Sequence, residues 1–320
     1  LNGALLPQKL LDMIFNTILK YMNTKVMRKL FLCLSVIGMI LTGCSKNDDE
    51  DNGENEGKLP DLPALPDPDD VCSAMDDLNF MSYCYDKVDV NKDGKVSVNE
   101  ANAVKEMKMS GLNIKNLIGI ERFPNLQTLL YTGAGEIDLR YNEELIEVDF
   151  SKSATTKIDL SRCKKLASFN ANSSKSLITV IFSDDIETIE YHTTAFYDCT
   201  NLSSITFPKN LTLNTVDIFF RCTNLTNITF SQKVETINGS IWDCPNLVNL
   251  TFPESLISVG QYAFERCNLK SVTCYSTTPP IIEDRSFMSY LAILFVPQNS
   301  LQAYKDSDWA KVFKDIQPIK

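Results

Sequence analysis

Apolar positions recur along the chain at a fixed spacing between residues 196 and 274. Four stretches, 22 or 23 residues apart, each carry an aromatic residue, a cysteine, a leucine, an aliphatic residue and a final Phe or Cys. The stretches are 196–207, 220–230, 242–252 and 264–274. The residues in step are Cys199, Cys222, Cys244 and Cys267, Leu202, Leu225, Leu247 and Leu269, and Ile205, Ile228, Leu250 and Val272. Because repeats of this length are stacked structural units, the period predicts a solenoid.

The second half of each repeat predicts a β-strand. Leu202, Ile205 and Phe207 end in an alternation of inward and outward positions, as a strand requires. A second aliphatic pair, such as Val234 and Ile237, lies on the return path. Stacked at roughly 4.8 Å, successive strands would form a parallel sheet with a buried apolar ladder behind it.

An earlier series has a period of 21 residues and begins at Leu126 and Leu129. The pairs with this spacing are Leu145 and Leu166, Val148 and Phe169, Ile137 and Ile158, and Leu139 and Leu160. Leu177 lies only 11 residues after Leu166, with Val180 and Phe182 following it, so the register of this join stays open. We expect about eight strand-forming segments in the repeat region, residues 125–276.

The repeated phrase resembles a known family. Ala195-Phe196-x-x-Cys199-x-Asn201-Leu202-x-x-Ile205-x-Phe207-Pro208 is similar to the BspA-type leucine-rich repeats of bacterial cell-surface proteins, closely over residues 177–274. Residues 125–176 look like 21-residue repeats of the internalin kind, and residues 277–320 look like a C-terminal cap. The resemblance implies an α/β leucine-rich repeat solenoid with a parallel sheet on its concave face. It also implies a surface adhesin or interaction module and not an enzyme.

A short apolar run precedes a cysteine near the start of the chain. Met27-Arg28-Lys29 leads into residues 30–41, and Leu41-Thr42-Gly43-Cys44 ends the run. This order is typical of a bacterial lipoprotein signal, so we expect a signal peptide over residues 27–44 and a lipid on Cys44. The run is too short to span a bilayer, which leaves the lipid as the only membrane contact. The alternative is a buried apolar helix with an incidental cysteine, and residues 1–26 are interpreted as an upstream mis-start.

Residues 45–70 are acidic and rich in proline. Asp48-Asp49-Glu50-Asp51 follows Cys44 closely, and a segment of this composition buries too little apolar surface to fold, so it predicts a disordered tether. The acidic cluster resembles the surface-export signal of lipoproteins in anaerobic gut and oral Gram-negative bacteria. It therefore implies an outer-membrane lipoprotein exposed on the cell surface. A plain acidic linker on a periplasm-facing protein is the alternative.

The chain is acidic overall, with 31 Lys and Arg against 41 Asp and Glu and a formal net charge of −10. Such a chain repels the phosphate backbone and anionic lipid surfaces, so we expect no nucleic-acid partner.

Residues 89–100 match the EF-hand calcium loop at each defining position. Side-chain oxygens, a backbone carbonyl and a bidentate carboxylate are offered by Asp89, Asn91, Asp93, Lys95, Ser97 and Glu100. The match predicts one structural Ca²⁺ site in a small helical EF-hand-like N-terminal cap over residues 71–124, in which Ala101, Val104 and Met107 have the spacing of a helix face. A loop that turns without metal is the alternative. The loop also resembles half of a dockerin, although a dockerin normally carries two loops.

Catalysis has no positive support in the sequence, and we predict no catalytic residues. His192 is the single histidine, which excludes metal sites built on several histidines and is interpreted as a surface-loop residue. No Cys-x-x-Cys spacing is present, so zinc binding is not expected. The cysteines that recur in the repeats predict a ladder of buried thiols, although disulfides stay open.

Outward positions of the predicted strands are polar and uncharged. They are Ser204, Thr206, Asn227, Thr229, Asn249, Thr251, Ser271 and Thr273. Such a stripe could hydrogen-bond an extended protein ligand from a host extracellular or bacterial surface, although Thr is also simply a good exposed strand residue. We therefore predict an adhesion or protein-interaction module. The alternative is glycan capture for nutrient uptake, which would be marked by aromatic platforms.

Overall fold

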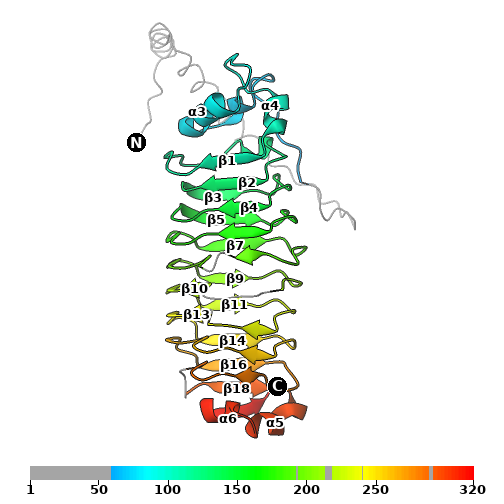
Figure 1. The fold of residues 1–320 in the computed structure, drawn as a ribbon, viewed down its shortest axis with the longest axis vertical. Coiled ribbons are helices and arrows are strands. Elements are labelled where there is room, and N and C mark those ends of the chain that lie inside the picture. The colour runs from blue at the N-terminus through cyan, green and yellow to red at the C-terminus, as the bar shows by residue number, and fades with distance from the viewer. Residues whose placement is uncertain (1–58, 192–193, 213–217, 240, 288–290) are drawn as a thin grey trace, which may run out of the picture. The chain divides into compact units, whose positions relative to one another are not determined.

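The structure is a computed structural model that describes residues 59–320, apart from 192–193, 213–217, 240 and 288–290. The expected signal peptide, Cys44 and His192 lie outside the described residues. Within the described part, coils stack on one another and their strands pair in parallel (Figure 1). The predicted parallel-sheet solenoid is confirmed. No helix in this part of the chain is long and apolar enough to cross a membrane.

Short helices precede the sheets. They are η1 (Val71–Ala74), α3 (Leu78–Lys87) and α4 (Val98–Ala103). Asp77 caps α3, because its Oδ1 accepts the N–H groups of Asn79 and Phe80, each at 2.9 Å. Val104 is extended and ends α4. Met107 therefore lies on β1 (Glu106–Met109), and not on a continuing helix as the spacing predicted.

The first sheet has the strand order β1-β2-β4-β6-β8. Its further strands are β2 (Thr128–Tyr131), β4 (Glu147–Asp149), β6 (Ser168–Asn170) and β8 (Glu190–Tyr191). Leu129 pairs with Val148, and Val148 pairs with Phe169, so the early repeat series shares one face. Since β1 pairs with β2, the stack begins at Glu106 and not near residue 125, and the expected helical cap over residues 71–124 contains a strand.

At the join after Leu166, whose register was left open, the repeat series moves from the first sheet to a second one. β3 (Ala134–Asp138), β5 (Ala154–Leu160) and β7 (Thr179–Phe182) form a second sheet, in which Ile158 pairs with Val180. Val180 therefore continues the face of Ile137 and Ile158, and not that of Phe169. The N–H of Ser203 then donates to the carbonyl of Ile178 at 3.2 Å, which leads this face into the later repeats.

The later repeats build the longest sheet, in the order β19-β18-β16-β14-β11-β9. Its strands are β9 (Ser204–Thr206), β11 (Asn227–Thr229), β14 (Asn249–Phe252), β16 (Ser271–Cys274), β18 (Ile293–Val296) and β19 (Asp315–Pro318). The return paths also form strands, namely β10 (Phe219–Phe220) with β13 (Ile241–Trp242), and β12 (Thr236–Ile237) with β15 (Ser258–Val259) and β17 (Ile281–Ile282). Among the described residues of this region, fifteen strands, β2 to β16, lie where about eight strand-forming segments were expected.

In the described residues, the helices of the predicted α/β class are confined to the two ends of the stack and to short turns. Besides the first helices, the described residues form η2 (Ile120–Arg122), η3 (Gln298–Ser300), α5 (Leu301–Lys305) and α6 (Trp309–Val312). Residues 277–320 were expected to form only a cap, yet β18 and β19 extend the sheet there. Trp309 is fully buried and donates through Nε1 to the carbonyl of Pro280 at 2.8 Å, so α6 closes the last coil.

A ladder of apolar side chains runs behind the sheets. The rings of Phe196 and Phe219 are stacked with centroids 5.2 Å apart, and Phe264 stacks on Phe287 at 5.1 Å. The eight cysteines of the described residues are all free and buried, which confirms the predicted thiols in the core. In the later coils the thiol donates to a carbonyl one coil earlier, from Cys199 to Ala171, Cys222 to Phe196, Cys244 to Phe219 and Cys267 to Ile241.

Residues 59–70 lie against the coils, although they were expected to belong to a disordered tether. The Tyr141 hydroxyl donates to the carbonyl of Pro60 at 2.9 Å, and the Arg122 guanidinium donates to the carbonyl of Pro63. Leu65 packs against the core. Composition alone did not reveal these contacts. We call residues 59–70 the strap.

Candidate functional site

The predicted partner-binding residues lie together on the longest sheet. One row pairs Ser204 with Asn227 and Asn249 with Ser271, and the second pairs Thr206, Thr229, Thr251 and Thr273 in succession. The structure therefore brings all eight predicted side chains onto four neighbouring strands, β9, β11, β14 and β16. We call these eight residues the polar stripe.

The polar stripe faces away from the core. The residues between its two rows, Ile205, Ile228, Leu250 and Val272, are at most 3% exposed, which fixes the alternation of each strand. Ser204, Ser271 and Thr273 are half-buried, and the other five stripe residues are exposed. Ser271 donates to the Asn249 side chain at 2.7 Å. The stripe thus presents uncharged hydroxyl and amide groups on the outer side of the sheet.

The two rows of the stripe continue onto apolar residues of β18 that the sequence did not predict. Ile293 pairs with Ser271, and Phe295 pairs with Thr273, so both extend the two rows onto β18. Both side chains are half-buried. The signal was the alternation over residues 293–296, but the repeat cysteine is absent there and the segment was interpreted as part of a cap.

A second line of half-buried side chains follows the return path. Tyr197 lies against Phe220 with ring centroids 5.1 Å apart, and Phe220 lies against Trp242 at 4.7 Å. The Arg266 guanidinium lies 6.0 Å from the centroid of the Trp242 ring. We call Tyr197, Phe220 and Trp242 the aromatic ladder. Neighbouring rings are tilted by 39° to each other and all three side chains are half-buried, so the ladder differs from an open platform for sugar rings.

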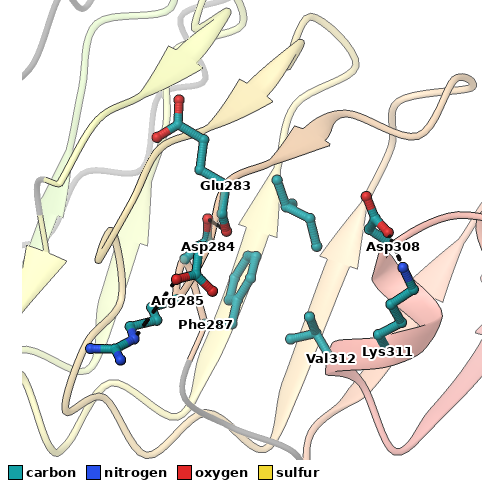
Figure 2. Close-up of a pocket in the computed structure, with 9 residues that line it drawn as sticks. Glu283, Asp284, Arg285, Phe287, Asp308, Lys311 and Val312 are labelled. Carbon is teal, nitrogen blue, oxygen red and sulfur yellow. Dashed lines mark hydrogen bonds and ion pairs between the residues drawn. The ribbon is translucent and has the colours of Figure 1, made fainter.

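One pocket, of about 340 Å³, lies between the turn after β17 and helix α6 (Figure 2). Lys311 pairs with Asp308 at 2.7 Å, and Arg285 lies 3.9 Å from Asp284. Glu283 accepts the N–H of Gln261 at 3.0 Å. Glu283 and Asp308 thus accept hydrogen bonds, and Asp284 lies beside Arg285. These contacts give no positive sign of a carboxylate pair arranged for acid–base catalysis. The absence of an enzymatic activity stays a prediction.

The predicted calcium ligands lie in the loop between α3 and α4 and at the start of α4. Gly94, with φ of 82°, makes the turn, and backbone N–H groups of the loop donate to side chains of the same loop. The bonds are Gly94 N–H to Asp89 Oδ2, Asp93 N–H to Asn91 Oδ1 and Lys95 N–H to Asp93 Oδ1, each at 2.9 Å. The loop is therefore ordered by the residues that were predicted to bind the ion.

Glu100 closes the loop from its far end. Its Oε2 accepts the backbone N–H and the hydroxyl of Ser97, and its Oε1 accepts the N–H of Val90 at 2.9 Å. These hydrogen bonds, led by the Ser97 N–H, lower the pKa of the Glu100 carboxyl. Among the described residues, no three acidic, cysteine or histidine side chains are grouped closely enough to hold a metal ion. Calcium therefore stays a prediction.

Comparison with known proteins bears on the repeats. Residues 164–293 match the model of the BspA type leucine rich repeat region in six copies. Over these residues the chain is similar to BspA-type repeats. The matched range contains residues 177–274, where the likeness was predicted to be close, while residues 125–163 lie outside it. No curated protein matches the chain.

Two solved structures are similar at low identity. A leucine-rich repeat protein from Bacteroides ovatus ATCC 8483 shares 14% identity over 68% of this chain and 69% of that chain, with a TM-score of 0.32. The pneumococcal vaccine antigen PcpA shares 11% identity over 62% of this chain and 78% of that chain, with a TM-score of 0.30. At these identities and TM-scores, the two structures support no conclusion about function.

Proposed function

We propose that the protein is a cell-surface lipoprotein whose solenoid acts as an adhesion or protein-interaction module, with the polar stripe as its binding surface. The observation that carries the proposal is the alignment of eight uncharged polar side chains in two rows on four adjacent strands. A stack of coils presents such rows as an extended surface, which is how repeat proteins bind their partners.

A protein partner suits the chemistry of this surface. The stripe offers donors and acceptors at the spacing of strands, and Ile293 and Phe295 add apolar side chains beside it. Interfaces between proteins commonly combine a buried aromatic residue with surrounding hydrogen bonds. Phe295 would therefore anchor a partner that the stripe aligns.

The surface location rests on the start of the sequence. The apolar run before Cys44 and the acidic residues 48–51 favour a lipid-anchored protein displayed outside the outer membrane of a Gram-negative bacterium. The partner would then be a host extracellular protein or a protein on another bacterial surface. No catalytic role is part of the proposal.

The test is binding of the full chain, in detergent micelles, to an array of extracellular-matrix proteins and polysaccharides. Thr229→Lys and Thr251→Lys place bulky charges within the stripe, and Thr278→Lys makes the same change at an exposed turn outside it. We expect saturable protein binding that the two stripe variants abolish and Thr278→Lys retains. Equal binding by all three variants would rule out the stripe.

Glycan capture is the second candidate, and the aromatic ladder is the observation in its favour. Sugars stack on aromatic rings, but here Phe220 lies between Tyr197 and Trp242, and Arg266 approaches Trp242. Each ring would then offer only part of its surface to a glycan. Binding confined to polysaccharides and lost in Trp242→Ala would favour this candidate over a protein partner.

A further inference from the structure

Two buried cysteines lie next to each other where the strap ends. Cys72 belongs to η1 and Cys84 to α3, and both are fully buried free thiols. Their side chains are hydrogen-bonded to each other, and this bond, followed by burial, raises the pKa of the Cys84 thiol. Two cysteine side chains in contact need little movement of the backbone to form a disulfide.

Asp70 holds η1 and α3 together at this point. Its Oδ1 accepts the backbone N–H of Cys72 at 3.0 Å, and its Oδ2 accepts the hydroxyl of Tyr85 at 2.7 Å. Tyr85 directly follows Cys84 in the chain, so one carboxylate ties the backbone of Cys72 to α3 beside Cys84. The approach of the two cysteines therefore has a support besides the contact between their thiols.

The thiols of the later coils are bonded differently. Cys244 also lies next to Cys222 and Cys267, but each of these three thiols donates to a carbonyl oxygen one coil earlier. A disulfide there would leave a buried carbonyl without its donor, which is costly. The Cys84 thiol has the Cys72 side chain as its partner instead. Oxidation of this pair replaces that hydrogen bond by a covalent bond.

We propose that Cys72 and Cys84 form a disulfide that fastens the end of the strap to α3. The proposal rests on the surface location proposed above, because disulfides persist in oxidising environments outside the cytoplasm. It is independent of the polar stripe and of any partner bound there.

The oxidant is the disulfide of a thiol oxidoreductase or of oxidised glutathione. One cysteine, as its thiolate, attacks that disulfide, forms a mixed disulfide and releases the first sulfur of the oxidant. The second cysteine attacks the mixed disulfide, which joins Cys72 to Cys84 and releases the second sulfur. The two cysteines lose two protons and two electrons, and the oxidant takes them up as two thiols. Because both thiols are buried in the folded chain, the exchange takes place while these elements fold.

The disulfide would act on the strap because Cys72 lies two residues after its end. At its start the strap is held by single hydrogen bonds, from Tyr141 to Pro60 and from Arg122 to Pro63. A pull on the chain ahead of the strap, where the lipid is proposed to be attached, can break these bonds one after another. A covalent link at Cys72 stops the opening there, before α3 is unfolded.

The test is refolding of the full chain in detergent micelles, in a buffer of oxidised and reduced glutathione. The remaining thiols are then alkylated in urea, and the chain is digested with trypsin. Trypsin cuts after Lys58 and Lys87, so residues 59–87 form one peptide that carries both cysteines. Mass spectrometry should find this peptide without alkyl groups and two hydrogen atoms lighter, at least tenfold more abundant than every other form of it.

A predominance of any other form of the peptide, whether alkylated or linked to a third cysteine, would overturn the proposal. Because the buffer supplies the oxidant, this outcome would say nothing about the surface location or the polar stripe. Cys244→Ser is the matched control. It removes a buried thiol outside the pair and should give the same oxidised peptide as the wild type.

Hydrogen exchange tests the effect of the disulfide on the end of the strap. The amide of Cys72 donates to Asp70, and that of Met75 donates to the Cys72 carbonyl. Both amides should be at least tenfold better protected in the oxidised wild type than after addition of a reductant. The reductant should change neither amide in Cys84→Ser. Equal protection of the oxidised and reduced wild type would contradict the role of the disulfide in fastening the strap.

Discussion

The Cys222 thiol donates a hydrogen bond to the carbonyl oxygen of Phe196, 3.0 Å away and one coil earlier. Ser174 occupies the equivalent place two coils before Cys222, and its hydroxyl donates to the carbonyl of Phe150 at 2.6 Å. Both side chains are fully buried. The turn therefore requires a small side chain with a donor, and a thiol or a hydroxyl satisfies it.

Substitutions at Cys222 should separate size from chemistry. Cys222→Ser keeps a small donor, so we expect the free energy of unfolding to fall by less than about 1 kcal/mol. Cys222→Leu overfills the turn and should cost about 1–3 kcal/mol. Urea denaturation measures both, with Thr229→Leu as an exposed control expected within about 0.5 kcal/mol of the wild type. A serine variant less stable than the leucine variant would contradict this account.

The buried thiols predict a loss of stability in alkali. Burial raises the pKa of the Cys199 thiol, and that of Cys163, from 9.0 to about 12. Above pH 9 the unfolded chain loses these protons while the folded chain keeps them. Their contribution is therefore complete below pH 9 and is lost between about pH 9 and 12, by up to about 1.4 kcal/mol per pH unit for each thiol.

Urea denaturation at pH 8, 9 and 10 tests this dependence. We expect the free energy of unfolding to fall more steeply from pH 9 to 10 than from pH 8 to 9, and the fall to be shallower in Cys199→Ser. The interval ends at pH 10 because burial also raises the pKa of Tyr131, from 10.0 to about 12, which adds its own loss at higher pH. Identical slopes for Cys199→Ser and the wild type would show that this thiol does not titrate on unfolding.

The later repeats were predictable because one period fixes both their sheet and their exposed face. Thr229 and Thr251 are 22 residues apart in sequence and are paired in the sheet, so the polar stripe followed from spacing alone. The move of the repeat series from the sheet of β6 to the sheet of β7 did not follow from spacing. Leu166 leads into β6 and Leu177 leads into β7, although both lie three residues after a small buried side chain, Cys163 and Ser174. The same local pattern, a small buried residue followed three residues later by Leu, therefore precedes strands of two different sheets.

Other features depend on contacts between distant residues. β18 pairs with β16 without a repeat cysteine, so no periodic signal marked it. The strap is held by Tyr141 and Arg122, which are donors far along the sequence. For the calcium loop, the motif named the ligands, but only the structure revealed the unpartnered oxygen of Asp89 and the bonds of Val96 to Asp70 and Val71.

Gly133 should be intolerant of any side chain. A Cβ at this position would overlap the carbonyl oxygen of Ile114 and the hydroxyl of Tyr131, which itself donates to that carbonyl at 3.2 Å. Tyr131 is fully buried and cannot move aside without a cavity. We expect Gly133→Ala to lower the free energy of unfolding by about 1–3 kcal/mol.

Gly111→Ala is the matched comparison for Gly133→Ala. Gly111 has φ of 78°, but a Cβ added there would have no heavy atom within 4 Å, so alanine meets only backbone strain. We expect a cost of about 1–2 kcal/mol from the left-handed conformation. Thermal unfolding of both variants, with hydrogen exchange on β1 and β2, separates the two causes. Local loss of protection should follow Gly133→Ala alone, and its absence would argue against the overlap.

Each cysteine of the later coils follows a residue in the left-handed conformation. The residues are Asp198, Arg221, Asp243 and Arg266, with φ between 55° and 60°. Such a backbone costs a non-glycine residue about 1–2 kcal/mol, whereas glycine adopts it freely but loses about 0.5–1 kcal/mol of entropy on folding.

Arg221 is the best position to test this balance, because its side chain is 50% exposed and lies no closer than 3.9 Å to Asp198. We expect Arg221→Gly to leave the free energy of unfolding unchanged or raise it by up to about 1 kcal/mol. Arg221→Val should lower it by at least about 1 kcal/mol, since a β-branched residue tolerates positive φ poorly. Urea midpoints measure both variants, and equal midpoints would mean that the turn relaxes out of the left-handed region when its side chain changes.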